Sequence, residues 1–164
     1  MNRFWLRLDN KLKHSPAHFI LQTLLAFVSL AIILSQIGLL GRGVLVAALG
    51  SSIFVAFLTP AAYTARARNI IGSHVLSGAI GIGFHHLIAV FPENYSVFIL
   101  LSAASVALSM FVMVATDTEH PPAAGTALGL SMEGSLMSFL FISISVIALV
   151  IIKRLLDPWL EDLV

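Results

Sequence analysis

The chain has 164 residues, of which 59% are hydrophobic and 10% are charged, and its mean hydropathy is +1.00. This composition excludes a soluble globular domain and indicates an integral membrane protein. The formal net charge of +1, without a dense cluster of basic residues, gives no indication of nucleic-acid binding. The absence of cysteine excludes disulfides, thiolate metal sites and a cysteine nucleophile.

The N-terminal segment is basic. It contains Arg3, Arg7, Lys11 and Lys13. Because lysine and arginine accumulate on the cytoplasmic side of membrane proteins, we expect residues 1–15 to be cytoplasmic. The apolar stretch that follows is too long for a signal-peptide core and has no small-residue cleavage site, so we expect it to be a permanent span.

Five uncharged stretches are each long enough to cross a hydrocarbon core, which takes about 20 helical residues. They cover residues 14–41, 43–65, 69–92, 94–116 and 134–152. A sixth stretch, residues 120–132, is too short to cross at about 1.5 Å per residue. The predicted fold is an all-α polytopic membrane protein with five long spans and one short broken helix. Residues 1–164 form a single transmembrane domain with a short C-terminal tail over residues 156–164.

Basic residues in later connections set the expected orientation. Arg66 and Arg68 follow the second stretch, and Lys153 and Arg154 follow the fifth, so these regions and both termini are expected on the cytoplasmic side. We expect the membrane to be a bacterial inner membrane. Five full spans would place the termini on opposite sides, so the short segment must form part of a sixth passage.

A short internal similarity suggests two halves. Residues 48–50, Ala-Leu-Gly, recur as residues 127–129, 79 positions later, and the same offset carries Ser52 onto Ser131. A match this short also arises by chance in a chain rich in alanine, leucine and glycine. If the similarity is real, each half holds three segments and the halves are inverted repeats, an arrangement that many transporters use to build a midplane binding site.

A polar segment, residues 116–120, separates the fourth stretch from the short one. Proline has no N–H and disfavours helical geometry in the residue before it, so one helix ends before His120 and another begins at Pro121 and Pro122. The first N–H groups of the new helix are expected to lack intrahelical partners and to face the polar segment. Together with the helix dipole they would form a site for a small oxyanion.

The candidate ligands lie near this break and its counterpart in the first half. Thr126, Ser51 and Ser52 offer hydroxyl donors, while Gly125 and Gly50 let the backbone approach a ligand. Small residues also permit tight helix packing in lipid, the interpretation that we prefer for other small positions such as Gly129 and Ala48. The full set of predicted substrate-binding residues is His120, Pro121, Pro122, Gly125, Thr126, Gly50, Ser51, Ser52, Arg68, Asn69, His74 and Thr118.

His120 is the residue singled out for chemistry. A protonated imidazole would carry positive charge with a bound anion and release it as the proton leaves. The alternative is that its ring only caps the preceding turn. Asp117 and Glu119 flank it with negative charge that repels anions, which keeps a cation substrate open. His85 and His86 point about 100° apart on a helix and so do not form a metal-chelating pair. We expect no metal site and no cofactor.

Three motifs resemble the HPP family of small integral membrane proteins. Residues 118–128, Thr-Glu-His-Pro-Pro-Ala-Ala-Gly-Thr-Ala-Leu, resemble its signature. Residues 50–52, Gly-Ser-Ser, resemble its Gly-Ala-Ser turn, and residues 68–74, Arg-Asn-Ile-Ile-Gly-Ser-His, resemble its Arg-Asn-x-x-Gly-Gly-His segment. Ala67 and Ser73 depart from the usual proline and glycine, which concerns the shape of that loop. The resemblance implies about four spans and, because plant members are implicated in nitrite transport into chloroplasts, nitrite as a substrate.

The expected function is a transporter or channel for a small inorganic anion, nitrite first, coupled to protons. We expect a homo-oligomer, because so small a chain can scarcely enclose a pathway alone. The alternatives are a transporter of a small cation or neutral solute, or a structural or regulatory membrane subunit. An enzyme is not expected, because Asp117 is the only aspartate between Asp9 and Asp157 and no nucleophile with a base is visible within the spans.

The distribution of basic residues predicts that reporters fused to either end of the chain will report the cytoplasm. Paired reporters that are active on opposite sides of the membrane provide the measurement. A fusion after Val164 that reports the outside would contradict the six-segment arrangement.

Overall fold

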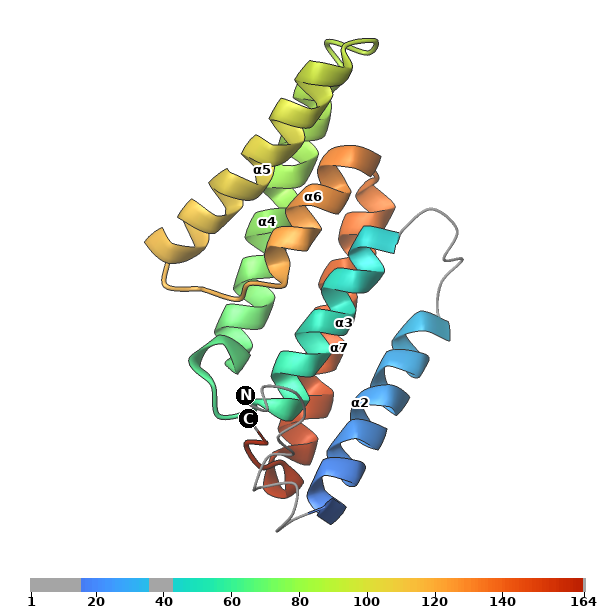
Figure 1. The fold of residues 1–164 in the computed structure, drawn as a ribbon, viewed down its shortest axis with the longest axis vertical. Coiled ribbons are helices and arrows are strands. Elements are labelled where there is room, and N and C mark those ends of the chain that lie inside the picture. The colour runs from blue at the N-terminus through green and yellow to red at the C-terminus, as the bar shows by residue number, and fades with distance from the viewer. Residues whose placement is uncertain (1–15, 36–42, 164) are drawn as a thin grey trace, which may run out of the picture.

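The computed structural model describes residues 16–35 and 43–163, and within these ranges every regular element is a helix. Expectations for residues 1–15, 36–42 and 164, including the basic N-terminal segment, lie outside the described residues. The α-helices, drawn in Figure 1, are α2 (Pro16–Ser35), α3 (Gly43–Leu58), α4 (Ala67–Ile88), α5 (Tyr95–Ala115), α6 (Ala123–Glu133) and α7 (Leu136–Leu156). Two 3-10 turns accompany them, η1 (Tyr63–Ala65) and η2 (Asp157–Trp159).

Local chemistry explains where the helices begin and end. α3 stops at Leu58, two residues before Pro60, which has no N–H to continue the ladder. α5 and α7 begin with side-chain caps, because the Asn94 and Ser135 oxygens accept from backbone N–H groups three residues later, at 3.0 and 3.2 Å. α6 ends at Gly134, whose φ of 60° is the left-handed conformation that suits glycine at a helix C-terminus.

Three helices are long and apolar enough to cross a membrane, over Ala67–Ile88, Tyr95–Ala115 and Leu136–Trp159. The five long spans expected from the sequence are therefore not confirmed among the described residues. α3 has 16 residues and reaches about 24 Å, short of a core of about 30 Å. The apolar part of α2, Ala17–Ile32, also falls below the length of a full span. The short broken helix is present as α6, which has 11 residues.

α6 lies at the centre of the bundle, in contact with α3, α4, α5 and α7 (Figure 1). Small residues make this position possible. A Cβ on Gly81 of α4 would lie 2.6 Å from the Ala127 carbonyl oxygen, and one on Gly129 would lie 2.7 Å from the Leu45 side chain. In lipid no hydrophobic effect drives helices together, so they associate through van der Waals contacts that small residues make possible.

α3 and α6 run antiparallel where they touch. Gly125 lies against Ala48 and Gly129 lies against Leu45, so residue numbers rise along one helix as they fall along the other.

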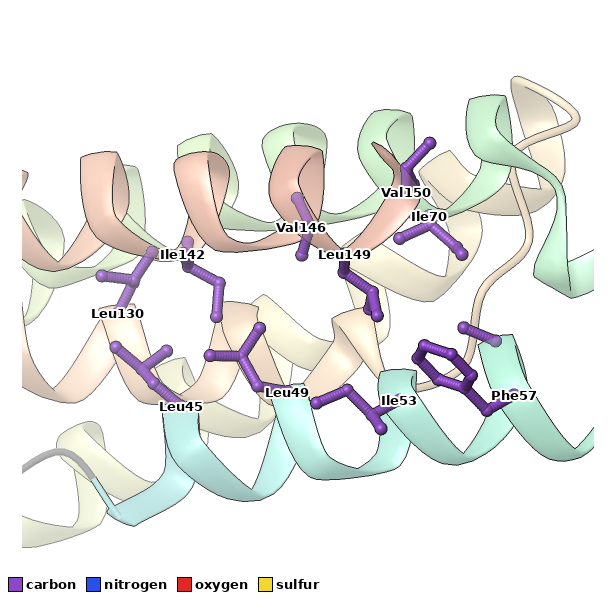
Figure 2. Packing of buried hydrophobic residues seen from close by; sticks show 11 residues of the cluster. Leu45, Leu49, Ile53, Phe57, Ile70, Leu130, Ile142, Val146, Leu149 and Val150 are labelled. Carbon is purple, nitrogen blue, oxygen red and sulfur yellow. The ribbon is translucent and has the colours of Figure 1, made fainter. Parts of the chain in front are cut away.

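An apolar layer joins α3 to α7 and to parts of α4 and α6 (Figure 2). Four of its α3 members, Leu45, Leu49, Ile53 and Phe57, recur every four residues, which places them on one face of that helix. The labelled side chains of Figure 2 are Leu45, Leu49, Ile53, Phe57, Ile70, Leu130, Ile142, Val146, Leu149 and Val150. Because this layer takes up one face of α3, polar side chains of the same helix can face α4 and α6.

The start of α2, the end of α3 and the segment after α7 meet at one end of the bundle. Gln22 donates from Nε2 to the carbonyl oxygens of Phe57 at 2.7 Å and Glu161 at 2.8 Å, and Leu163 N–H donates to the Leu58 carbonyl. The start of α4 lies at this same end (Figure 1). The lysines and arginines among the described residues belong to the start of α4 and the last turn of α7: Arg66, Arg68, Lys153 and Arg154.

We predict that Gly81→Ala destabilises the protein by about 1–3 kcal/mol, because the new methyl group must push α4 away from the α6 backbone. Gly83→Ala is the matched control on the same helix, since a Cβ there meets no atom within 4 Å. Its higher helix propensity should leave stability unchanged or slightly raised. Thermal unfolding of both variants in detergent measures the difference, and equal unfolding temperatures would show that the close approach is not required.

Candidate functional site

Two buried histidines meet at a serine in the middle of the bundle. His74 of α4 and His120, in the turn before α6, both direct Nε2 at the Ser52 hydroxyl of α3, at 2.8 and 2.9 Å. The two ring centroids are 5.4 Å apart. The outer ring nitrogens are also bonded, His74 Nδ1 to Thr126 Oγ1 at 2.7 Å and His120 Nδ1 to the Thr64 carbonyl oxygen at 2.8 Å.

We call Ser52, His74, His120 and Thr126 the histidine cluster. Each of its four side chains is 0% exposed. They come from α3, α4, α6 and the turn before α6, so the cluster ties α3 and α4 to the N-terminal part of α6. The sequence predicted all four as site residues, and the structure brings them into one hydrogen-bonded group.

The backbone fixes the direction of these hydrogen bonds when the cluster is neutral. The Thr64 carbonyl can only accept, so His120 carries its hydrogen on Nδ1 and its Nε2 accepts from the Ser52 hydroxyl. Ser52 Oγ then accepts from Nε2–H of His74, whose Nδ1 accepts from the Thr126 hydroxyl. In these four hydrogen bonds every donor therefore faces an acceptor.

A serine between histidines also resembles part of a hydrolase site, which sequence spacing did not reveal. Two features separate the cluster from that chemistry. Ser52 is fully buried, and the histidine rings are oriented by Thr126 and by the Thr64 carbonyl, whereas hydrolase histidines are oriented by a carboxylate. The arrangement is suited to holding or moving a proton between neutral groups.

An open groove of about 800 Å³ lies beside the cluster, between α3 and the start of α6. Four predicted site residues line it: Gly50, Ser51, Pro121 and Pro122. Thr64 lines the groove too, and its carbonyl oxygen holds His120. A Cβ on Gly50 would meet no atom within 4 Å, so the backbone there is open to the groove. Eight of the predicted residues thus lie in a buried cluster or in an open groove. Thr64 lies between the two, because it lines the groove and its carbonyl oxygen bonds to His120.

One expectation about the α6 N-terminus is wrong. The N–H groups of Ala123, Ala124 and Gly125 were expected to be free for an anion, but they donate to the carbonyl oxygens three residues earlier, at 2.9, 3.1 and 3.1 Å. The reason is that the first turn after the two prolines tightens into 3-10 geometry, which satisfies these donors within the chain. Gly125 packs against Ala48 and so serves the helix contact.

The turn before α6 is held by hydrogen bonds from the first turn of α4. Arg68 Nη2 donates to the Thr116 carbonyl at 2.9 Å, and Asn69 Nδ2 donates to the Glu119 carbonyl at 3.1 Å. Thr118 bonds to the Thr116 hydroxyl at 2.8 Å, and its methyl group is 3.2 Å from a Cβ built on Gly72. The predicted residues Arg68, Asn69 and Thr118 therefore hold the turn in place.

The Asp117 side chain of this turn is also held in place. Tyr63 donates its hydroxyl to Asp117 Oδ1 at 2.6 Å, and Arg68 lies 3.7 Å from Oδ2. The hydrogen bond to Asp117 raises the pKa of Tyr63, so the phenol stays protonated at neutral pH. Asp117 has a φ of 58°, a left-handed conformation in which aspartate is tolerated. The sequence reading overlooked Tyr63 and Thr64. Thr64 acts through its backbone carbonyl, which no sequence pattern exposes.

A smaller hollow of about 170 Å³ lies on the α5 side of His120. Its polar lining is Glu119 and His120, and the remaining lining residues are Met110, Met113, Val114, Pro121 and Ala124. Glu119 Oε2 is buried and has no hydrogen-bond partner among the described residues. One carboxylate oxygen next to the histidine cluster therefore has no hydrogen bond among the described residues.

The remaining histidine pair lies elsewhere in the bundle. His85 Nδ1 is 3.2 Å from the Ser131 carbonyl oxygen, and its ring lies edge-on to His86 at 6.0 Å between centroids. His85 therefore helps to hold the C-terminal end of α6.

Comparison with known proteins gives one family. The family model described as HPP, transmembrane region, matches residues 11–156, which is most of the chain. No curated protein and no solved structure matches the chain significantly.

Proposed function

This chain belongs to the HPP transmembrane family, and from that premise we propose that it transports a small inorganic anion, with nitrite the first candidate and a proton as the coupled ion. The observation that carries the proposal is the histidine cluster. Ionisable groups are costly inside a membrane protein, and where they occur they typically mark pathways for ions or protons. A bundle that only needed to pack would be served by apolar side chains at these positions.

The groove beside Thr64 is the proposed place for the anion. Ser51 and Thr64 offer hydroxyls there, and Gly50 leaves the backbone accessible. His120 lies directly behind, bonded to the Thr64 carbonyl. A proton passed from the imidazolium of His120 to a nitrite oxygen would give neutral imidazole and neutral nitrous acid. The uncharged acid crosses apolar surroundings at a far lower cost than the anion.

Helix directions support an inverted pair of halves as part of this proposal. The antiparallel contact of α3 and α6 is what two inverted three-helix units require. With the described lysines and arginines at the start of α4 and the last turn of α7, the same reasoning makes the end of the bundle where these segments lie cytoplasmic. A second copy of the chain that covers the open groove would close it from lipid, which favours a homo-oligomer.

A small cation is the second candidate, on the strength of Glu119. Glu119 lines an apolar hollow beside His120, and its Oε2 is buried without a hydrogen-bond partner among the described residues. A carboxylate in such surroundings attracts a cation or a proton. A cation transporter would lose uptake on Glu119→Gln, whereas an anion transporter should retain or gain it.

The test of the proposal is uptake of labelled nitrite, nitrate, formate and chloride into proteoliposomes, with and without a pH gradient. We expect nitrite uptake that increases when the donor side is acidic. His120→Ala should abolish the pH-dependent part, and His120→Gln, which is polar but cannot titrate, should lose the pH dependence and retain some exchange.

His86→Gln is the matched control, because this exposed histidine lies outside the cluster. Oligomer size and thermal stability in detergent must be equal across the variants, since a misfolded protein would also be inactive. A stable His120→Gln protein with the pH dependence of the original chain would show that the imidazole only shapes the turn.

A further inference from the structure

The Ser52 hydroxyl has more neighbours than it has hydrogens. Its single hydrogen can point to His120 Nε2 at 2.9 Å, to His74 Nε2 at 2.8 Å or to the Ala48 carbonyl oxygen at 2.9 Å, one helical turn earlier. In the neutral cluster the hydrogen points to His120, because Nε2 of His120 has no hydrogen of its own. The Ala48 carbonyl then waits as an unused acceptor for this hydroxyl.

Because the Ala48 carbonyl oxygen can accept the Ser52 hydrogen, one additional proton can bind to His120. When a proton binds Nε2 of His120, the ring becomes an imidazolium that donates from Nδ1 to Thr64 and from Nε2 to Ser52. The Ser52 hydrogen turns to the Ala48 carbonyl, and Ser52 Oγ now accepts from both histidines. Apart from the added proton, the two states differ only in the rotation of the Ser52 hydroxyl. The charged form is as fully hydrogen-bonded as the neutral one, with no movement of a heavy atom.

We propose that Ser52 is a two-position switch that lets the paired imidazoles of His74 and His120 store one proton inside the membrane. The step balances with the groups present. The incoming proton forms a bond to Nε2 of His120, the Ser52 O–H bond rotates without breaking, and the hydrogens on Nδ1 of His120 and Nε2 of His74 stay in place.

Charged groups around the cluster are few. From η1 and the start of α4 come Tyr63, Arg66 and Arg68, and from the turn before α6 come Asp117 and Glu119. Asp117 is bonded to Tyr63 and lies beside Arg68, and Glu119 directly precedes His120 but has no hydrogen bond to its ring among the described contacts. α3 has no titratable side chain over Gly43–Leu58, α5 has only Tyr95 at its far end, and α6 has only Glu133 at its far end. α7 contributes Lys153 and Arg154 in its last turn, away from α6.

The test reads the protons directly. In the full chain, labelled with ¹⁵N-histidine and reconstituted in lipid, the ring nitrogens are assigned by NMR across a pH series. At high pH we expect hydrogen on Nδ1 of His120 and on Nε2 of His74. On acidification we expect the pair to take up one proton before a second. Neutral His120 with its hydrogen on Nε2, or two independent titrations, would overturn the proposal without any mutation.

Two adjacent serines provide the matched variants. Ser52→Ala removes the acceptor that the described residues offer to Nε2–H of the imidazolium, so the first titration should move down by about one pH unit, as expected for the loss of a hydrogen bond to a charged group. Ser51→Ala should leave it unchanged, because the Ser51 hydroxyl is exposed and donates to the Ala47 carbonyl oxygen. Ser52→Thr restores a hydroxyl and should restore the midpoint. An unchanged midpoint in a folded Ser52→Ala protein would overturn the switch.

This inference deepens the proposed function, since coupling to a proton needs a place to keep one, yet its outcome is separable. A chain that shows the expected ring protons and the Ser52→Ala shift but takes up none of the four anions would retain the switch and lose the anion proposal. A chain that takes up nitrite with a pH dependence equal in the original protein and in Ser52→Ala would do the reverse.

Discussion

A buried imidazole has to find a partner for each ring nitrogen, and this requirement governs how the central helices are placed. A polar group that is buried without a hydrogen bond costs roughly 2–7 kcal/mol, so two histidines in this bundle need four good contacts. They obtain them from Ser52 of α3, Thr126 of α6 and the Thr64 carbonyl of η1. These partners lie far apart in the sequence. The hydrogen bonds of the cluster therefore determine how α3, α4 and α6 are placed relative to one another. Nonspecific contact with lipid would not determine this placement.

Small residues let the helices come close enough for those bonds. Gly81 of α4 lies against the α6 backbone, and Gly129 of α6 lies against Leu45 of α3. A larger residue at either place would separate helices whose side chains must bridge 2.7 to 2.9 Å between heavy atoms. The N-terminal end of α6 contributes to the same geometry. Pro121 and Pro122 lead into this helix directly after His120, whose side chain is buried. Packing and polar contacts thus depend on one another.

The sequence was informative wherever a residue type limits the backbone. The two prolines predicted a short helix close to its observed start, and Gly134 marks its observed end. The sequence could not tell that Ser52 faces the histidines while Ser51 faces the groove, because adjacent positions differ by about 100° and the apolar pattern of α3 runs almost all round the helix. Thr64 was beyond reach because it contributes a carbonyl. The N–H groups at the start of α6 are not free as expected, because the first turn has 3-10 geometry and they donate to carbonyl oxygens three residues earlier. The sequence does not distinguish this geometry from an α-helical first turn.

Neutral partners for the histidines bear on how the proposed anion would be accepted. A carboxylate bonded to the rings would hold them positive but would itself repel an anion. In this chain Asp117 is bonded to Tyr63 and lies beside Arg68, so its charge is compensated outside the cluster, and the ring nitrogens bond to groups other than Glu119. The rings are held by hydroxyls and a carbonyl, which accept or donate without adding charge. A positive charge can then appear on His120 only with a proton, and an anion in the groove beside Thr64 is what would stabilise that proton. Each charge makes the other less costly to bury, which is the physical basis for expecting the two ions to move together.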